Sequence, residues 1–253
     1  MTVADALLVI SAGLLAGAMN TVAGGGTLVT YPVLLLCGLP PISANITSAV
    51  GLAPGYAGGA YAYRRELRGQ RRRHLALGPT AIVGAITGAA LLLVTPPGPF
   101  QTMVPFLVLA SCLLLLVQPV FAAAVARRAG EGRDRVSLPA HAGIFLASVY
   151  GAYFSAGLGV LMLAVLGIVF GDGLQRLNGL KSSLSGIVVL TAVMVYAASG
   201  QVAVGYAALL LVASYLGGTA GGAVARRLDP GVLRYTVSAL GIALAVVLFL
   251  TRR

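Results

Sequence analysis

Glycine-rich breaks interrupt the apolar sequence once in each half of the chain, and each break precedes a short apolar segment. Closely spaced glycines end a regular helix, and a helix that starts after them presents unpaired backbone N–H groups and a positive dipole end. Two such helix starts would together favour an anion without a buried full charge. Alternatively, the glycines only let helices pack closely. The candidate site residues in these breaks are Asn20, Gly24, Gly25, Gly26, Thr27, Gly157 and Gly159.

Two short polar runs follow the breaks, at residues 44–48 and 177–182. Their amide and hydroxyl groups can donate hydrogen bonds to an oxyanion. The same groups also link membrane helices, at about 0.6 kcal/mol for each bond on average. An asparagine at the matching position of each run favours binding, so the polar side chains are further candidates. They are Asn45, Thr47, Ser48, Asn178 and Ser182.

Lys181 is the only basic residue inside an apolar segment and away from its ends. Ionisable residues within a membrane are costly and are candidates for function by default. As a point cation, Lys181 would attract an anion. Its long stem could equally carry the ammonium group to water at the membrane surface, so both roles stay open.

Other chemistries lack their residues in this sequence. No Asp or Glu lies deep in an apolar segment, which argues against a carboxylate proton relay and an acid-lined cation pathway. There is neither a GxxxxGK[ST] phosphate loop nor a serine partnered with a histidine and a carboxylate. The two histidines and two cysteines do not have the spacing of metal ligands. We therefore predict no enzyme activity, no cofactor and no metal site.

The elements that must position these residues are membrane helices. The chain is 58% hydrophobic and 9% charged, whereas a soluble domain carries about 25% charged residues. Residues 6–63, 75–126 and 182–225 contain no charged side chain, and a spanning helix needs about 20 apolar residues. The net charge of +11 comes from arginines in short loops, as in membrane proteins, and no basic domain suits nucleic acid. We predict an all-α polytopic protein whose surroundings are a lipid bilayer.

Loops and breakers divide the chain into eight to ten hydrophobic segments, and a shift of 133 residues superposes the two halves. The shift pairs Gly26 with Gly159 and Asn45 with Asn178. We predict a first membrane repeat at 1–126, a linker at 127–136 and a second repeat at 137–253. The expected segments are 3–22, 27–37, 42–63, 75–94 and 101–126, then 138–155, 160–170, 177–198, 202–224 and 232–251.

The arginines predict how these segments cross the membrane. Loops 64–73 and 127–136 hold most of them, whereas loops 38–41, 95–100 and 199–201 hold none. By the positive-inside rule the basic loops are cytoplasmic. Loops 64–73 and 199–201 are equivalent under the shift and would face opposite sides. This is an inverted-topology repeat with glycine-broken hairpins, an arrangement found in secondary transporters.

At these motifs the chain resembles the sulfite exporter TauE/SafE family, also called the toluene sulfonate uptake permease family. The likeness lies in the glycine-rich stretch 17–26, the basic loop after Tyr63, the run 176–181, and the stretches 199–202, 217–222 and 225–228. The resemblance implies transport of sulfite, sulfonates or related sulfur oxyanions and organosulfur acids. It also implies a multi-pass protein of the bacterial inner membrane.

Together these observations predict a secondary transporter that exports a small anion by alternating access of its two repeats. The inside-negative potential alone can drive anion export, at about 2.3 kcal/mol per charge per 100 mV. Two other functions stay open, a passive small-anion channel and a membrane scaffold subunit without transport. A homodimer is the oligomeric state that we expect.

Overall fold

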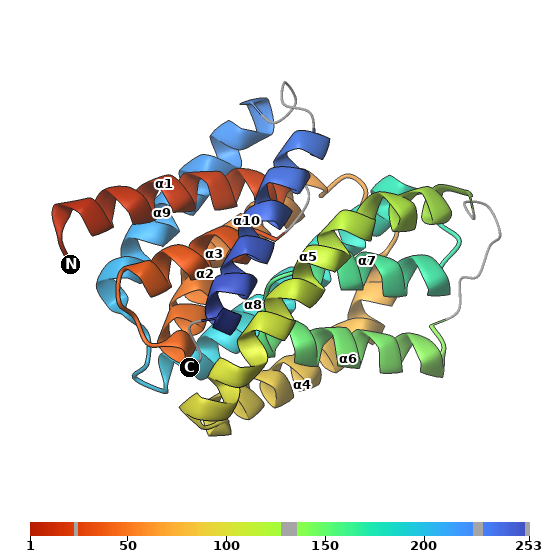
Figure 1. Cartoon of the computed structure of the whole chain (residues 1–253). Helices are drawn as coiled ribbons and strands as arrows, with labels where there is room; N and C mark the ends of the chain where they lie inside the picture. Colours follow the sequence, from red (N-terminus) through yellow and green to blue (C-terminus); the bar gives the residue numbers. More distant parts are fainter. Residues whose placement is uncertain (23–24, 128–135, 225–229, 251–253) are drawn as a thin grey trace.

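The described residues of the computed structural model, 1–22, 25–127, 136–224 and 230–250, form ten α-helices and no strand (Figure 1). The first five are α1 (Val3–Val22), α2 (Thr27–Leu36), α3 (Pro41–Ala62), α4 (Arg71–Val94) and α5 (Pro97–Arg127). The second five are α6 (Leu138–Tyr153), α7 (Leu158–Val169), α8 (Leu174–Ala197), α9 (Val204–Val224) and α10 (Pro230–Leu250). The predicted all-α architecture is confirmed.

The helices have the length and the surface of membrane-embedded elements. Four of them are long and apolar enough to cross a bilayer, with spans at Val3–Asn20, Arg71–Val94, Pro97–Arg127 and Leu174–Ala197. Large apolar side chains such as Phe106, Leu113 and Val212 are 57–62% exposed. An aqueous surface rarely carries such extensive apolar patches, whereas lipid tails suit them. The chain is therefore a membrane-embedded α-helical protein.

Each half contains a hairpin in which a longer helix is followed by a short one. Helix α2 has 10 residues and α7 has 12, and at about 1.5 Å per residue neither reaches across the hydrocarbon core. The turns need glycine, because Gly25 has a φ of 91° and Gly157 a φ of 82°, which is a region that other residues rarely adopt. The hairpin tips therefore lie where the glycine-rich breaks predicted an interruption.

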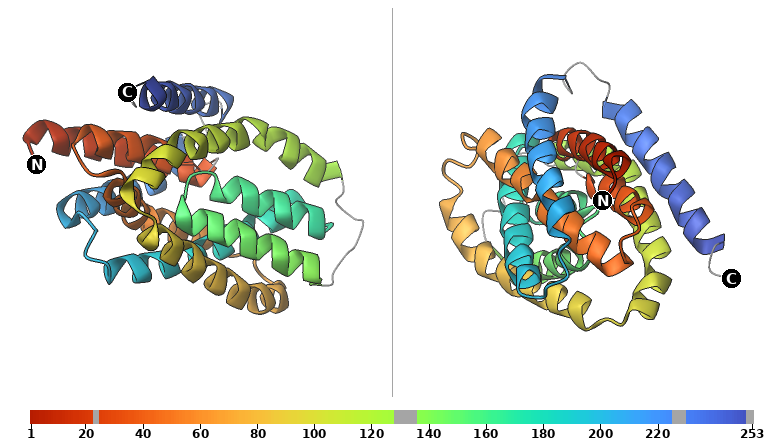
Figure 2. Two further views of the ribbon diagram at one scale, coloured as in Figure 1. Left: turned by 60° about the horizontal axis from the view of Figure 1, so that its bottom comes forward. Right: turned by 90° about the vertical axis from the view of Figure 1, so that its left-hand side faces the viewer.

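The two halves use the same pattern of helix contacts. Helices α3 and α8 contact each other, α9 packs against α1 and α3, and α4 packs against α6 and α8. Exchanging the first five helices for the second five reproduces these pairings. Helix α10 lies at the periphery, against α5 and α2 (Figure 2). Thus α10 of the second half packs against the short helix α2 of the first, and α5 of the first half packs against the short helix α7 of the second.

Glycines allow the closest of these contacts. A Cβ on Gly17 of α1 would overlap the backbone carbonyl oxygen of Ser214 on α9, and a Cβ on Gly88 of α4 would overlap that of Val149 on α6. Small residues let membrane helices approach to backbone contact in this way. The α1–α9 and α4–α6 pairs are therefore fixed by backbone packing on both flanks of the central α3–α8 pair.

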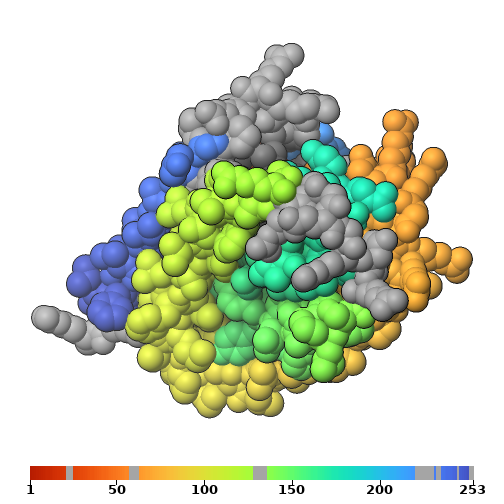
Figure 3. Space-filling view, turned by 90° about the vertical axis from the view of Figure 1, so that its right-hand side faces the viewer, coloured from red at the N-terminus to blue at the C-terminus, as the bar shows by residue number. Residues whose placement is uncertain are grey.

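The connections between helices gather at two opposite ends of the molecule. The α2–α3, α4–α5 and α8–α9 connections lie at the end with the N-terminus (Figure 1). They line a cavity of about 390 Å³ whose described lining includes Ser43, Gln101 and Gln201 but no charged side chain. At the other end lies the α3–α4 connection, and Figure 3 shows its orange segment projecting there. Its exposed arginines are Arg64, Arg65, Arg68, Arg71 and Arg72.

The remaining basic loops fall largely outside the described residues. The predicted linker 127–136 coincides with the stretch 128–135, and the arginines at 226 and 227 lie in the stretch 225–229. Helix α5 ends at Arg127 and α6 begins at Leu138. The division into repeats at 1–126 and 137–253 stays a prediction, to which the matching helix contacts of the two halves lend support.

Candidate functional site

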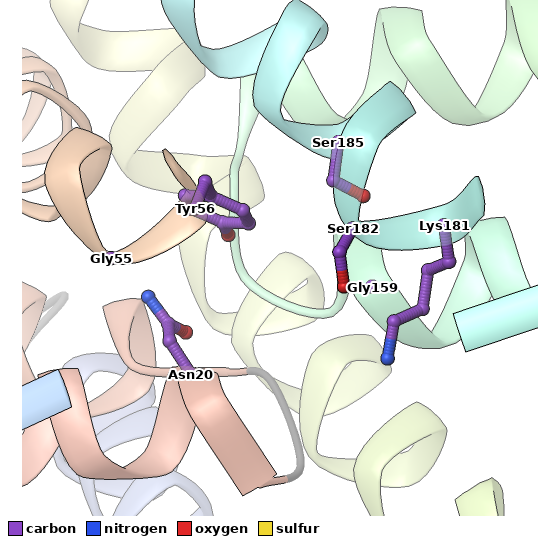
Figure 4. A pocket seen from close by; sticks show the side chains of 7 residues that line it. All are labelled: Asn20, Gly55, Tyr56, Gly159, Lys181, Ser182 and Ser185. Carbon is purple, nitrogen blue, oxygen red and sulfur yellow. The ribbon is translucent and has the colours of Figure 1, made fainter. Parts of the chain in front are cut away.

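A small cavity lies where helices of the two halves meet, and Figure 4 shows the side chains around it. Its volume is about 30 Å³, which leaves room for only a few water-sized groups. Helices α1, α3, α7 and α8 all contribute to its wall. The lining residues are Asn20, Gly55, Tyr56, Gly159, Lys181, Ser182 and Ser185.

Asn20, near the end of α1, presents its amide nitrogen to this cavity. The side-chain oxygen Oδ1 accepts a hydrogen bond from the backbone N–H of Gly26 at 2.9 Å. Because Oδ1 must face that donor, Nδ2 takes the other direction, where it lies beside Gly55 and is buried without a hydrogen-bond partner among the described residues. Asn20 therefore holds the first hairpin tip with its oxygen, while its two N–H donors bond to none of the described residues.

Helix α8 adds a positive charge and two hydroxyl groups. Ser185 comes three residues after Ser182 and four after Lys181, so it shares a face of the helix with each of them, and all three line the cavity (Figure 4). Ser185 is only 1% exposed, and its hydroxyl has no hydrogen-bond partner in the described part of the chain. Within the described ranges, the ammonium group of Lys181 has neither an ion pair nor a hydrogen bond. No carboxylate lines the cavity.

This set of groups has a clear chemical bias. A buried donor without a partner costs about 1–3 kcal/mol, and an unpaired cation within a membrane costs more. Two such donors, on Asn20 and Ser185, and the ammonium group of Lys181 all face one space. A group rich in hydrogen-bond acceptors and negatively charged would offset these costs together.

The second hairpin tip is anchored on α5 and opens toward the cavity. The carbonyl oxygen of Ala156 accepts hydrogen bonds from the hydroxyl of Tyr150 at 2.9 Å and from that of Ser111 at 3.0 Å. Gly157 packs against Ser111 and does not line the cavity. Gly159 does line it, and a Cβ there would meet no described atom within 4 Å. The missing side chain of Gly159 therefore leaves space in the site.

The first hairpin tip is packed more tightly. A Cβ on Gly26 would lie 2.7 Å from the backbone oxygen of Ala16, so this glycine permits close contact with α1. The hydroxyls of Thr27 and Ser155 are 2.8 Å apart and join the two tips. Gly25 supplies the positive φ of the turn. None of these residues lines the cavity, and Gly24 lies outside the described residues.

The polar run of α3 makes hydrogen bonds between helices and does not reach the cavity. Asn45 donates from Nδ2 to the carbonyl oxygen of Tyr153 at 2.9 Å, and Thr47 Oγ1 accepts from the backbone N–H of Ala203 at 3.0 Å. Ser48 bonds to the hydroxyl of Thr30 on α2. These bonds are of the kind that links membrane helices.

Of the predicted candidates, the structure brings Asn20, Gly159, Lys181 and Ser182 together around the cavity. Asn178 precedes them on α8 and lies outside the lining. Three other residues also line the cavity and were not predicted from the sequence: Gly55, Tyr56 and Ser185. The position of Ser185 four residues after Lys181 was a usable signal, because such residues share a helix face. Nothing in the sequence marked Gly55 or Tyr56.

Further polar contacts close the two ends of the molecule. At the basic end, Arg73 of α4 pairs with Asp172 and lies over the ring of Phe170, 4.4 Å from its centroid. Asp172 also lies 3.6 Å from Arg176 Nε. At the opposite end the contacts are neutral, since the Ser43 hydroxyl donates to the backbone oxygen of Gln201 at 2.7 Å. On α3, the cavity-lining residues Gly55 and Tyr56 follow Ser43 in sequence. On α8, the lining residues begin with Lys181, five residues after Arg176.

An all-α membrane protein with a polar cavity enclosed between two structurally matching halves has the architecture of a membrane transporter. The family model "Sulfite exporter TauE/SafE" matches residues 9–248. The chain belongs to that family, which confirms the resemblance seen in its motifs.

Individual relatives match over a shorter stretch. A probable membrane transporter protein, ORF9, of Sinorhizobium sp is 28% identical over 108 residues, which are 43% of this chain and 41% of the relative. Probable membrane transporter proteins of Haemophilus influenzae and Escherichia coli K12 (YfcA) are each 30% identical over 107 residues, 42% of this chain and 42% and 39% of the relatives. The chain thus spans about two fifths of these relatives. No solved structure matches it.

Proposed function

We propose that the protein is a secondary transporter that binds a small anion in the cavity between its halves. The observation that carries this proposal is a set of donors without a partner among the described residues: the buried Asn20 Nδ2 and Ser185 hydroxyl, and beside them the ammonium group of Lys181. An oxyanion accepts several hydrogen bonds at once and neutralises the cation. Sulfite or a related sulfur oxyanion fits this chemistry and the family to which the chain belongs.

Alternating access requires that each end opens while the other stays closed. The basic end is held by the Arg73–Asp172 ion pair, and the opposite end by neutral hydrogen bonds such as that from Ser43 to Gln201. Rocking of one half against the other would break the contacts at one end and then those at the other. With the basic end in the cytoplasm of a bacterium, the inside-negative potential favours export by about 2.3 kcal/mol per charge per 100 mV.

Flux in proteoliposomes tests the proposal. Purified protein should give saturable uptake of labelled sulfite and counterflow against sulfite inside. Lys181→Met should reduce this flux at least tenfold, because the cavity loses its cation. Arg68→Met is the matched control, since it removes one positive charge from an exposed loop and should leave the flux unchanged.

The other outcomes identify the competing functions. Flux without saturation or counterflow would indicate a passive channel, and absence of flux would indicate a scaffold subunit. An equal loss of flux in Lys181→Met and Arg68→Met would contradict the cavity as the binding site.

Opposite orientation of the two halves has its own test. Arg68 and Gln201 are exposed residues at opposite ends, and under the 133-residue shift the loops that hold them correspond. Single cysteines at these positions, with Cys37 and Cys112 replaced by serine and alanine, should react from opposite sides in intact cells. Labelling of both from one side would overturn the inverted arrangement.

A further inference from the structure

Gly159 differs from the tightly packed glycines of the helix interfaces because no described residue fills the space beside it. It is the second residue of α7, it lines the cavity, and a Cβ there would meet no described atom within 4 Å. Its φ lies outside the left-handed region that Gly157 adopts. Neither backbone conformation nor helix packing therefore requires glycine at this position.

The rest of the wall consists of side chains and of Gly55, where Asn20 Nδ2 lies 3.8 Å from the position that a Cβ would take. Asn20 lies on one side, Tyr56 beside it, and Lys181 and Ser182 descend from α8 on the other (Figure 4). The donors of Asn20, Lys181 and Ser185 would take the oxygen atoms of an anion. The remaining atoms of the ligand would then lie against the backbone at Gly159, where, in contrast to Gly55, no described atom lies within 4 Å of the Cβ position.

The size of the cavity limits what these remaining atoms can be. Its volume of about 30 Å³ compares with the roughly 10–15 Å³ that a cavity needs to hold one water molecule, so the space takes two or three groups of that size. A compact ion of a few heavy atoms fits such a space. An organic substituent on the same oxyanion would have to occupy the space beside Gly159, and that space holds only a small group.

We propose that Gly159 sets the upper size limit of the transported anion, so that the site selects compact inorganic sulfur oxyanions over sulfonates with an organic substituent. This rests on the proposed function, because it assumes that the cavity binds the transported anion. The family resemblance implies both inorganic sulfur oxyanions and organic sulfonates as substrates, and the size limit would favour the first kind.

A competition series in proteoliposomes tests the size limit in the unaltered protein. Counterflow of labelled sulfite is measured with sulfite, thiosulfate, methanesulfonate, taurine and toluenesulfonate as unlabelled competitors. We expect inhibition to weaken as the substituent grows, with at least a tenfold rise in the inhibition constant from sulfite to taurine. Equal inhibition by sulfite and taurine would overturn the size limit.

A pair of variants assigns the limit to Gly159. Gly159→Ala adds one methyl group to the cavity and should raise the KM for sulfite at least fivefold. Gly205→Ala is the matched control: Gly205 is the second residue of α9, a Cβ there also meets no described atom within 4 Å, and it does not line the cavity. It should leave the KM unchanged. Both variants should keep the melting temperature of the unaltered protein.

The outcomes separate this inference from the proposed function. An unchanged sulfite KM in folded Gly159→Ala would overturn the role of Gly159 while transport itself stands. Absence of saturable flux of every anion by the unaltered protein would overturn both. The competition series decides the size limit even where alanine at 159 impairs folding, because it uses no variant.

Discussion

The polar runs of α3 and α8 occupy equivalent positions in the two halves and do different things. The 133-residue shift pairs Asn45 with Asn178 and Ser48 with Lys181. In α3, both Asn45 and Ser48 bond to neighbouring helices and lie away from the cavity. In α8, Lys181 lines the cavity without a partner among the described residues.

The partner helix explains why equivalent positions diverge. Ser48 finds the hydroxyl of Thr30 on α2, whereas the residue equivalent to Thr30 in the second half is Leu163, which has no hydrogen-bonding side chain. Helix α7 therefore cannot hold a polar group at position 181 in place. The first half of the molecule uses its polar run to fasten helices, and the second half has its run available for a ligand.

Ser48→Lys, which gives α3 the residue of α8, should have the largest effect. Ser48 is fully buried, so the lysine would bring an unpaired charge into the protein interior, at a cost of about 3–5 kcal/mol. The melting temperature in detergent should fall steeply, or the protein should fail to accumulate. The reverse change, Lys181→Ser, is the control and should not lower stability. Equal melting temperatures for both variants would erase the distinction between the two runs.

Asn45→Ala should cost stability and leave binding intact. The substitution removes the donor to the Tyr153 carbonyl oxygen, and a buried acceptor without a partner costs about 1–3 kcal/mol. The melting temperature should fall, while the KM for sulfite, measured on folded protein, should stay the same. Asn178→Ala is the matched comparison on α8. A raised KM for sulfite in Asn45→Ala would indicate that Asn45 takes part in binding.

Composition and spacing predicted the helices well, because lipid imposes a simple requirement for long apolar segments. The predicted helix starts were late where a proline or an arginine stands in the first turn. Helix α3 begins at Pro41, α5 at Pro97 and α4 at Arg71, whereas segments beginning at 42, 101 and 75 were predicted. Proline suits the first turn of a helix, since its missing N–H has no intrahelical partner there. Arginine is equally well tolerated at the end of a membrane helix, where its side chain reaches water.

A site residue could be predicted only where its type is unusual for a membrane segment. Lys181 did so, because a cation in an apolar segment is costly. Gly55 and Tyr56 are ordinary residues of a membrane helix, and only the contact between α3 and α8 brings them to the cavity. The glycines at 26 and 159 are alike in sequence. Whether the missing Cβ leaves a packed surface or an open space depends on helices from elsewhere in the chain.

Ser185→Ala should have a moderate effect on binding and none on stability. The hydroxyl of Ser185 has no partner among the residues that the structure describes, so its loss leaves none of them unsatisfied. A hydrogen bond contributes about 1 kcal/mol, which corresponds to about a fivefold rise in the KM for sulfite. The measurement is sulfite counterflow beside a thermal unfolding curve. A loss of stability without a change in KM would place Ser185 with the fastening residues of α3.

The bond between Ser48 and Thr30 should give the smallest effect, at about 0.6 kcal/mol. Thr30 has a second acceptor within reach, the carbonyl oxygen of Gly26 at 3.4 Å, so Ser48→Ala leaves its hydroxyl partly satisfied. Thr30→Val and Ser48→Ala should therefore each lower stability, and the double variant should lose less than the sum of the two. Additive losses would mean that the pair is not coupled. Within the polar run at 44–48, the hydrogen bonds to other helices would then be those of Asn45 and Thr47, and the contrast with α8 would rest on those two residues.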